Sequence, residues 1–203
     1  MKFNKTLLSA VCGCVLGFSA SANAGAVITD GSTSMEKVMG ILIESFEGNG
    51  IDVTYNPTGS GAGITAALEG RADIGLSSRA LKEQEQEKLQ GIDVAYDGIV
   101  IVVNKANKLT DITTEQIKDV FTGKITNWKD SAVNDSIKVL SFNGVVPSEE
   151  TVLDKSYKLQ RPFVFVLNKA KQPSKDAKAF IDYAMSDEAK PLIVKAGVVP
   201  AKK

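Results

Sequence analysis

Residues 58–81 read TGSGAGITAALEGRADIGLSSRAL, and this stretch decides the fold. Gly59, Gly61 and Gly63 precede a run with helical spacing, and Ala72–Leu76 then gives a short apolar strand. Glycines at a helix entrance let backbone N–H groups approach a guest, and the helix N-terminus adds partial positive charge. The stretch predicts either a loop that holds a small oxyanion or a tight turn in which the glycines serve conformation alone.

Two nucleotide-binding patterns do not fit this loop. A Walker loop needs a lysine and a hydroxyl after its last glycine, but Ile64 and Thr65 follow Gly63. A dinucleotide fold needs the spacing G-x-G-x-x-G, whereas Gly59 and Gly61 are followed by Gly63 after a single residue. Both nucleotide functions are therefore disfavoured.

The preceding residues repeat the same strand, loop and helix order. Ala26–Ile28 is apolar and leads into a hydroxyl-rich turn, after which apolar residues recur at helical spacing from Met35. Thr33 followed by Glu36 predicts a capping box at the start of that helix. Ile51–Tyr55 is the next strand, so two successive units predict an α/β fold with a parallel sheet.

The loops after the three predicted strands carry the candidate binding residues. Ligands in open α/β sheets bind beyond the carboxyl ends of the strands, so these loops are expected to converge. Hydroxyls, backbone amides and one arginine fork form a cradle suited to an oxyanion. The predicted ligands are Ser32, Thr33 and Ser34 after the first strand, Ser60 and Gly61 after the second, and Ser78 and Arg79 after the third. Ser77 belongs to the same hydroxyl-rich third loop.

The middle of the chain predicts a departure from this sheet and a return to it. Leu81–Leu89 is predicted as a solvated helix, and Gly98–Val103 as a strand buried on both faces. Its predicted partner is Phe163–Leu167, beside which Arg161 is interpreted as a strand-entry residue. These two strands are expected to carry the chain out of one lobe and back.

Shorter signals mark the remaining elements. Thr113 with Gln116 predicts a capped helix, and Ile137–Phe142 predicts a strand that ends in an Asn-Gly turn. Ser174 is expected to cap a helix whose inward residues include Phe180, and the next helix opens near Ser186 with an unexplained proline, Pro191. Trp128 is expected to pack inside the second lobe.

Residues 1–24 have the pattern of a secretory signal. Lys2 and Lys5 precede an apolar run from Leu7 to Phe18, and Ala22-Asn23-Ala24 predicts cleavage after Ala24. Both cysteines, Cys12 and Cys14, lie in this leader, so the exported chain is expected to contain no thiol. A lipid anchor on Cys14 is the alternative, although the residues before it fit a lipoprotein signal poorly.

Charge and composition narrow the functions further. The chain has 24 basic and 24 acidic residues, and loss of Lys2 and Lys5 with the leader leaves a net charge of about −2. Bulk attraction to nucleic acid is therefore not expected. The chain has no histidine, which excludes histidine-based triads and histidine metal ligands.

Several motifs together resemble the phosphate-binding proteins of bacterial phosphate ABC transporters. They are DGSTSMEKV, PTGSGAGITAALEGRADIGLSSRALK, YDGIVIVVNK, ITTEQIKDVFTGKITNWKD, LQRPFVFVLNK and AFIDYAMSDEAKPLIVKAGVVP, in that order. The resemblance implies a type II periplasmic-binding-protein-like α/β fold, with two lobes whose parallel-sheet cores are flanked by helices. It also implies a monomer in the periplasm or secreted, without cofactor or metal, that binds inorganic phosphate and delivers it to a membrane permease.

Carried over by motif, Thr33 and Ser34 match the first-loop ligands, with Ser32 beside them. Ser60 matches the glycine-loop ligand, and Ser78 with Arg79 matches the third contact. Some relatives carry aspartate where this chain has Ser78. That carboxylate can accept the proton of hydrogen phosphate and so reject sulfate, and this chain has a serine hydroxyl in its place.

The family's Ser-Gly-Thr-Arg motif is absent, as if several tens of residues were deleted between Asp130 and Ser131. The expected division is a signal at 1–24, lobe one at 25–103 plus 161–203, and a shortened lobe two at 104–160. Phosphate binding is expected to be weakened by the missing ligands. The alternatives are a degenerate or interaction-only exported protein and, with less support, a phosphate-ester hydrolase.

Overall fold

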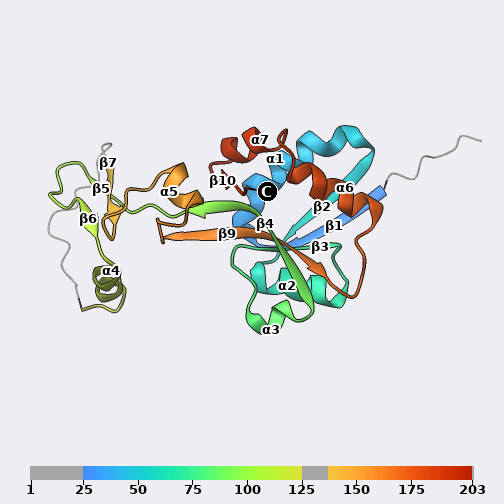
Figure 1. Cartoon of the computed structure of the whole chain (residues 1–203), viewed down its shortest axis with the longest axis horizontal. Coiled ribbons are helices and arrows are strands. Elements are labelled where there is room, and N and C mark those ends of the chain that lie inside the picture. The colour runs from blue at the N-terminus through green and yellow to red at the C-terminus, as the bar shows by residue number, and fades with distance from the viewer. Residues whose placement is uncertain (1–24, 125–136, 203) are drawn as a thin grey trace, which may run out of the picture.

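The computed structural model describes residues 25–124 and 137–202. The predicted leader, Trp128 and the junction of Asp130 with Ser131 lie outside these described residues. Figure 1 shows a larger body built on one sheet, a smaller body at the opposite end, and a narrow ribbon joining them. We call these the sheet body and the small body.

The sheet body contains a six-stranded sheet with the order β10-β4-β9-β3-β1-β2. β2, β1 and β3 are parallel, whereas β9 runs antiparallel to both of its neighbours and β10 runs antiparallel to β4. The sheet is therefore mixed, and its parallel part is the part predicted from the strand-loop-helix units. The strands are β1 (Gly25–Gly31), β2 (Ile51–Pro57), β3 (Ile74–Ser77), β4 (Leu89–Gly98), β9 (Gln160–Asn168) and β10 (Val199–Pro200).

Helices cover both faces of this sheet (Figure 1). Successive side chains of β9 point to opposite faces of the sheet. Phe163 and Phe165 enter the core on one face, while Val164 and Val166 enter the core on the other. The predicted α/β class, with helices flanking the sheet, is confirmed. One face carries η1 (Thr33–Met35), α1 (Glu36–Phe46), η2 (Glu47–Asn49), α6 (Lys175–Ala184) and α7 (Lys190–Lys195), and the other α2 (Ser60–Glu69) and α3 (Glu83–Gln86).

The joining ribbon is made by β4 and β9. β3 ends opposite Val164 of β9, but β4 continues along β9 until Gly98 pairs with Gln160. These two strands therefore pass beyond the sheet edge and enter the small body (Figure 1). Asp97 and Arg161 are paired here, with Arg161 Nη2 2.7 Å from Asp97 Oδ2, which supports the interpretation of Arg161 as a strand-entry residue.

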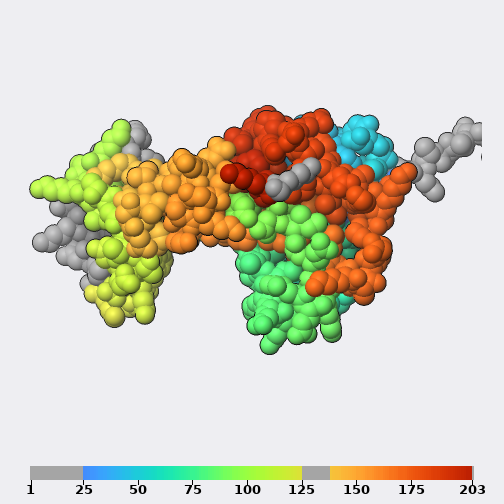
Figure 2. Space-filling view, in the orientation of Figure 1, coloured from blue at the N-terminus to red at the C-terminus, as the bar shows by residue number. Residues whose placement is uncertain are grey.

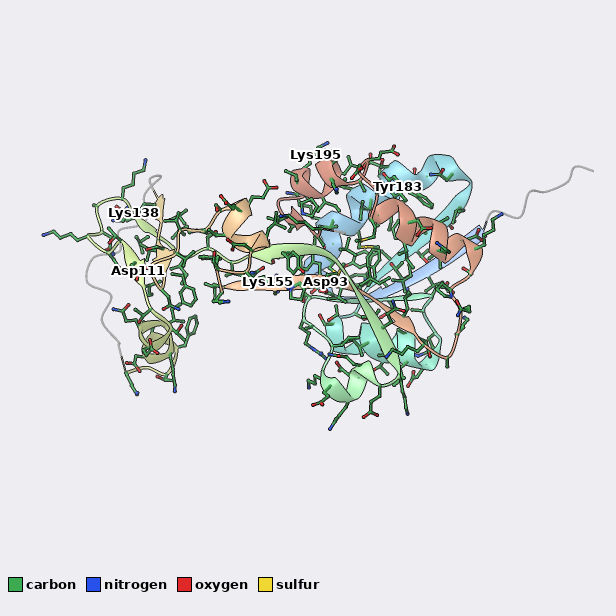
Figure 3. The ribbon with its side chains drawn as sticks, in the orientation of Figure 1. Asp93, Asp111, Lys138, Lys155, Tyr183 and Lys195 are labelled. Atoms are coloured by element: carbon green, nitrogen blue, oxygen red, sulfur yellow. The ribbon has the colours of Figure 1, made fainter. Side chains whose placement is uncertain are left out.

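The small body has two two-stranded sheets and a small core. Asp111 joins its strands, because its Oδ1 accepts hydrogen bonds from Ser141 Oγ at 2.6 Å and the Gly144 N–H at 2.9 Å (Figure 3). Its core is formed by Ile112, Leu140, Phe142, Val152 and Tyr157. Its elements are β5 (Val102–Asn104), β6 (Asp111–Ile112), α4 (Thr114–Phe121), β7 (Ile137–Val139), β8 (Ser141–Phe142) and α5 (Glu149–Leu153).

Four local predictions are wrong. The Thr33 side chain caps no helix, since Thr33 lies inside η1 and α1 begins at Glu36. The helix predicted at Leu81–Leu89 shrinks to α3, and Leu89 starts β4. Gly98–Val103 is not a buried strand, because only its end enters β5 and Val100 is 47% exposed. The strand predicted at Ile137–Phe142 is interrupted at Leu140.

Other local predictions are confirmed. Thr113 caps α4 in a capping box with Gln116, and Ser174 caps α6 by accepting from the Ala177 N–H at 3.1 Å. The Asn-Gly turn is present, with both residues at positive φ. Pro191 lies in the first turn of α7, where backbone N–H groups have no partner within the helix, so the missing N–H of proline costs no hydrogen bond. Within the described ranges, no helix is long and apolar enough to cross a membrane.

Candidate oxyanion site

The loops after β1, β2 and β3 meet at one edge of the sheet. Gly31 at the end of β1 lies opposite Pro57 of β2 and opposite Leu76 of β3. Because these strands are parallel, their carboxyl ends share an edge, and the residues that follow them gather there. The structure thus brings the predicted loops together, at the edge from which the ribbon of β4 and β9 extends.

Backbone hydrogen bonds lock the three loops to one another. The Ser32 N–H donates to the Leu76 carbonyl at 2.9 Å, and the Gly31 carbonyl accepts from the N–H groups of Thr58 and Gly59 at 2.8 and 2.7 Å. Gly31 has φ of +143°, and a Cβ there would overlap the Leu76 carbonyl oxygen. A side chain at this position is therefore incompatible with the close approach of the first and third loops.

The N-terminus of α2 is the main source of free amide groups. The Gly63 N–H makes the first intrahelical bond, to the Gly59 carbonyl at 3.0 Å. The amides of Ser60, Gly61 and Ala62 precede it and have no carbonyl partner within the helix. Gly63 also lets α2 approach β1, because a Cβ there would overlap the Asp30 carbonyl oxygen. The helix end is thereby held against the sheet edge.

The Ser60 side chain turns away from its own helix and contacts the third loop. Its Oγ accepts from the Ser78 N–H at 3.0 Å and lies 3.1 Å from Ser78 Oγ. The two hydroxyls therefore face each other beside the free amides of α2. This pair is the clearest meeting of predicted ligands in the structure.

The first loop offers a less uniform set of groups. Ser32 is 1% exposed, and its carbonyl accepts a hydrogen bond from Tyr55 Oη at 2.8 Å. Thr33 and Ser34 lie in η1 and are exposed. Burial, with a smaller contribution from Glu36, raises the pKa of Tyr55, so this hydroxyl stays a neutral donor. Ser32 positions the loop, and its exposed neighbours present donors to solvent.

Arg79 does not supply a free cation to the cradle. Its Nη1 and Nη2 lie 2.8 Å from Oε2 and Oε1 of Glu85, in a bidentate ion pair, and Nη1 also donates to the Ala80 carbonyl at 3.0 Å. This pairing raises the pKa of Arg79 and lowers the pKa of Glu85 to about 2. The sequence analysis expected the Arg79 fork to face an oxyanion and did not identify Glu85, six residues later, as its partner.

Two further residues support the cradle loops: Ser77, which the sequence analysis placed in the third loop, and Thr58, which it did not single out. Ser77 is fully buried and holds the turn before the ion pair, because its Oγ donates to the Arg79 carbonyl at 2.8 Å and accepts from the Arg79 N–H at 3.2 Å. Thr58 Oγ1 donates to Oδ1 of Asp30, which ties the second loop to the end of β1.

The edge opens onto a hollow between the two bodies. Figure 2 shows this hollow below the ribbon, between α4 of the small body and the α2 and α3 side of the sheet body. A small anion on the cradle would therefore be enclosed only if the bodies approached one another. Among the described residues, no group of histidine, cysteine or carboxylate side chains is arranged to hold a metal ion.

Comparison with known proteins identifies the family and supports the fold. The family model of the PBP superfamily domain matches residues 18–144. The phosphate-binding protein PstS 2 of Streptococcus agalactiae is 41% identical over 116 residues, which are 56% of this chain and 40% of the relative. PstS 2 of Streptococcus pneumoniae is 43% identical over 100 residues, 48% of this chain and 34% of the relative. The chain thus spans less than half the length of these curated relatives.

Solved structures extend the likeness over the whole fold. A phosphate ABC transporter substrate-binding protein from Clostridium perfringens, solved with bound phosphate, superposes with a TM-score of 0.76 at 30% identity. That match covers 88% of this chain and 100% of the other. An ABC-type phosphate transport receptor from Vibrio cholerae gives a TM-score of 0.76 at 26% identity, over 85% of this chain and 99% of the other.

Proposed function

The chain belongs to the PBP superfamily, and we propose that it is an extracytoplasmic protein that binds inorganic phosphate for import by an ABC transporter. The observation that carries this proposal is the pair of Ser60 and Ser78 hydroxyls beside the free amides of α2. Hydroxyl and amide donors at a helix N-terminus suit a small oxyanion. The phosphate bound by the related Clostridium perfringens protein supports the same ligand.

Each predicted ligand has its own proposed part. Ser60, Gly61 and Ser78 donate from the second and third loops, while Thr33 and Ser34 donate from the first. Ser32 acts by position, because its side chain is buried. Arg79 contributes its bidentate fork only when its ion pair with Glu85 opens, since both terminal nitrogens bond that carboxylate.

The proposed organisation follows from this role. Residues 1–24 are a secretory signal cleaved after Ala24, lobe one is 25–103 plus 161–203, and the shortened lobe two is 104–160. The protein acts as a monomer with a membrane permease as its partner, without cofactor, catalytic activity or contact with nucleic acid. Phosphate is released when the lobes separate.

One observation favours a second candidate, an exported protein with this fold that no longer binds phosphate. The Arg79 fork is occupied by Glu85, and each sheet described in the small body has two strands. Charge-assisted hydrogen bonds are worth roughly 1.5 to 3 kcal/mol each, so loss of several would weaken binding by orders of magnitude.

Calorimetric titration of the purified protein with phosphate, and separately with sulfate, distinguishes these candidates. We expect phosphate to bind, and Ser60→Ala to weaken its affinity about tenfold because one hydroxyl donor is lost. Ser45→Ala, at an exposed serine on α1, is the matched control and should bind as the unmodified protein does. Absence of heat at millimolar phosphate, or equal affinity of Ser60→Ala and Ser45→Ala, would contradict the proposal.

A further inference from the structure

A pocket of about 340 Å³ lies against the ribbon that joins the two bodies. Its size is within the range of small-molecule sites. Figure 3 shows Lys155 and Asp93 close together on the underside of this ribbon, facing the hollow of Figure 2. The lining includes Ala80, Asp93, Tyr96, Lys155, Lys158 and Gln160.

The pocket begins where the oxyanion cradle ends. Ala80 lines it, and Ala80 is two residues after Ser78. The guanidinium of Arg79 donates to the Ala80 carbonyl, so the third cradle loop forms one wall of the pocket. The opposite wall comes from the stretch between α5 and β9, which contains Lys155 and Lys158.

The position of Lys155 is fixed by several contacts. Its backbone has φ of +62°, and its N–H donates to the Val152 carbonyl at 3.3 Å. Its ammonium lies 5.5 Å from the centre of the Tyr96 ring, and Tyr96 Oη donates to Asp93 Oδ2 at 2.8 Å. A cation stacked on an aromatic ring is held without losing its charge.

The charge in this pocket is positive. Lys155 and Lys158 together outweigh Asp93, the acidic residue in the lining. The cradle itself holds no unpaired cation among its predicted ligands, because Glu85 neutralises Arg79. Lys155 and Lys158, both exposed to solvent, are the cations that line the pocket next to the third cradle loop.

We propose that Lys155 and Lys158 form a cationic wall beside the bound phosphate. Their positive charge replaces that of Arg79, which Glu85 neutralises. This inference rests on the proposed function. It assigns the ligand class as a small dianionic oxyanion, held by neutral donors on the sheet body and by ammonium groups at the ribbon. Asp93 lowers the affinity for that anion while it orients Tyr96.

The first test is phosphate titration of the double variant Lys155→Gln/Lys158→Gln. We expect affinity to fall at least about tenfold, because the two positive charges that line the pocket are lost. The control is Lys175→Gln/Lys195→Gln, which removes the same charge from exposed positions on α6 and α7 and should change affinity less than about twofold. Asp93→Asn should tighten binding, since the amide still accepts from Tyr96.

The second test needs no substitution, so it holds even if the lysine variants unfold. Acetylation of lysines in the unmodified protein is followed by mass spectrometry with and without millimolar phosphate. Phosphate should protect Lys155 and Lys158 but leave Lys175 and Lys195 equally reactive.

The outcomes separate the two proposals. In one outcome phosphate binds and Ser60→Ala weakens the binding, but Lys155 and Lys158 are not protected and their substitution does not change the affinity. The cationic wall is then refuted and the proposed function stands. If the unmodified protein binds no phosphate, both are refuted. If phosphate protects Lys155 and Lys158 from acetylation and the double variant loses affinity for phosphate, both proposals are supported.

Discussion

The sheet body and the small body achieve their structure in different ways. The sheet body packs one sheet between helices on both faces, with large buried side chains such as Phe165 and Phe180 in contact. The small body relies on two-stranded sheets, capped helices and a core of a few residues. Two-stranded sheets are marginal in water, so the small body should open more readily. The loops of the candidate site therefore belong to the well-packed body, and we expect the body beside them to be the less stable of the two.

The largest effect on stability should come from removing a large buried side chain from the core of either body. Phe165→Ala should destabilise the whole protein by about 3 to 5 kcal/mol, because it leaves a cavity in the main core. Phe142→Ala should instead unfold the small body alone. Hydrogen exchange measures both: in Phe142→Ala the amides of β5 to β8 should exchange quickly while those of β1, β3 and β9 stay protected. Loss of protection in β1 with Phe142→Ala would show that the bodies fold as one unit.

A smaller effect should follow from crowding the cradle. Gly63→Ala places a methyl against the Asp30 and Leu76 carbonyls, and we expect a loss of about 1 to 3 kcal/mol with weaker phosphate binding. Gly61→Ala is the control, since a Cβ there meets nothing within 4 Å. Urea unfolding of the two variants measures the difference in their free energies of unfolding. Equal stability would mean that α2 is not pressed against the sheet edge.

The smallest effect concerns the Arg79–Glu85 ion pair. Arg79 lowers the pKa of Glu85 to about 2, from 4.5, so the pairing stabilises the fold above pH 4.5 and this stabilisation is lost as pH falls towards 2. The contribution should be about 1 kcal/mol or less, because the Glu85 and Arg79 side chains are 23% and 37% exposed.

Unfolding free energies measured between pH 5 and pH 2.5 test this prediction. Glu85→Gln should show a weaker loss of stability on acidification than the unmodified protein. Glu83→Gln, at an exposed position of the same helix, should behave as the unmodified protein does. If the unfolding free energy of Glu85→Gln and of the unmodified protein fell equally with decreasing pH, the ion pair would not contribute to stability.

The sequence predicted the parts of the fold that depend on local patterns. Each parallel strand is followed by its own loop and helix, so the convergence of Ser60 with Ser78 followed from strand order. β4 was missed because its apolar positions are interrupted by a bulge between Asp93 and Ala95, while the apolar run after Gly98 suggested the buried strand instead. In that run Ile99, Val100 and Val102 are 42 to 47% exposed, whereas Ile101 and Val103 pack against the core of the small body.

The partners of the site residues could not be predicted in the same way. Thr33 with Glu36 has the sequence of a capping box, yet the Ser32 N–H is committed to Leu76, which sets the loop by a long-range contact. The guanidinium of Arg79 reaches Glu85 across a turn whose shape depends on the buried Ser77. Lys155 meets Tyr96 only because the ribbon brings them together. These pairings arise from tertiary structure.

The central claim is that a preformed cradle at the sheet edge holds phosphate. It is tested most directly by a phosphate titration followed through backbone amide chemical shifts. We predict saturable shifts largest at the amides of Ser60, Gly61 and Ser78, with smaller ones in η1 and none at Ser45. Shifts that are absent, that do not saturate, or that fall mainly outside the three cradle loops would contradict the claim.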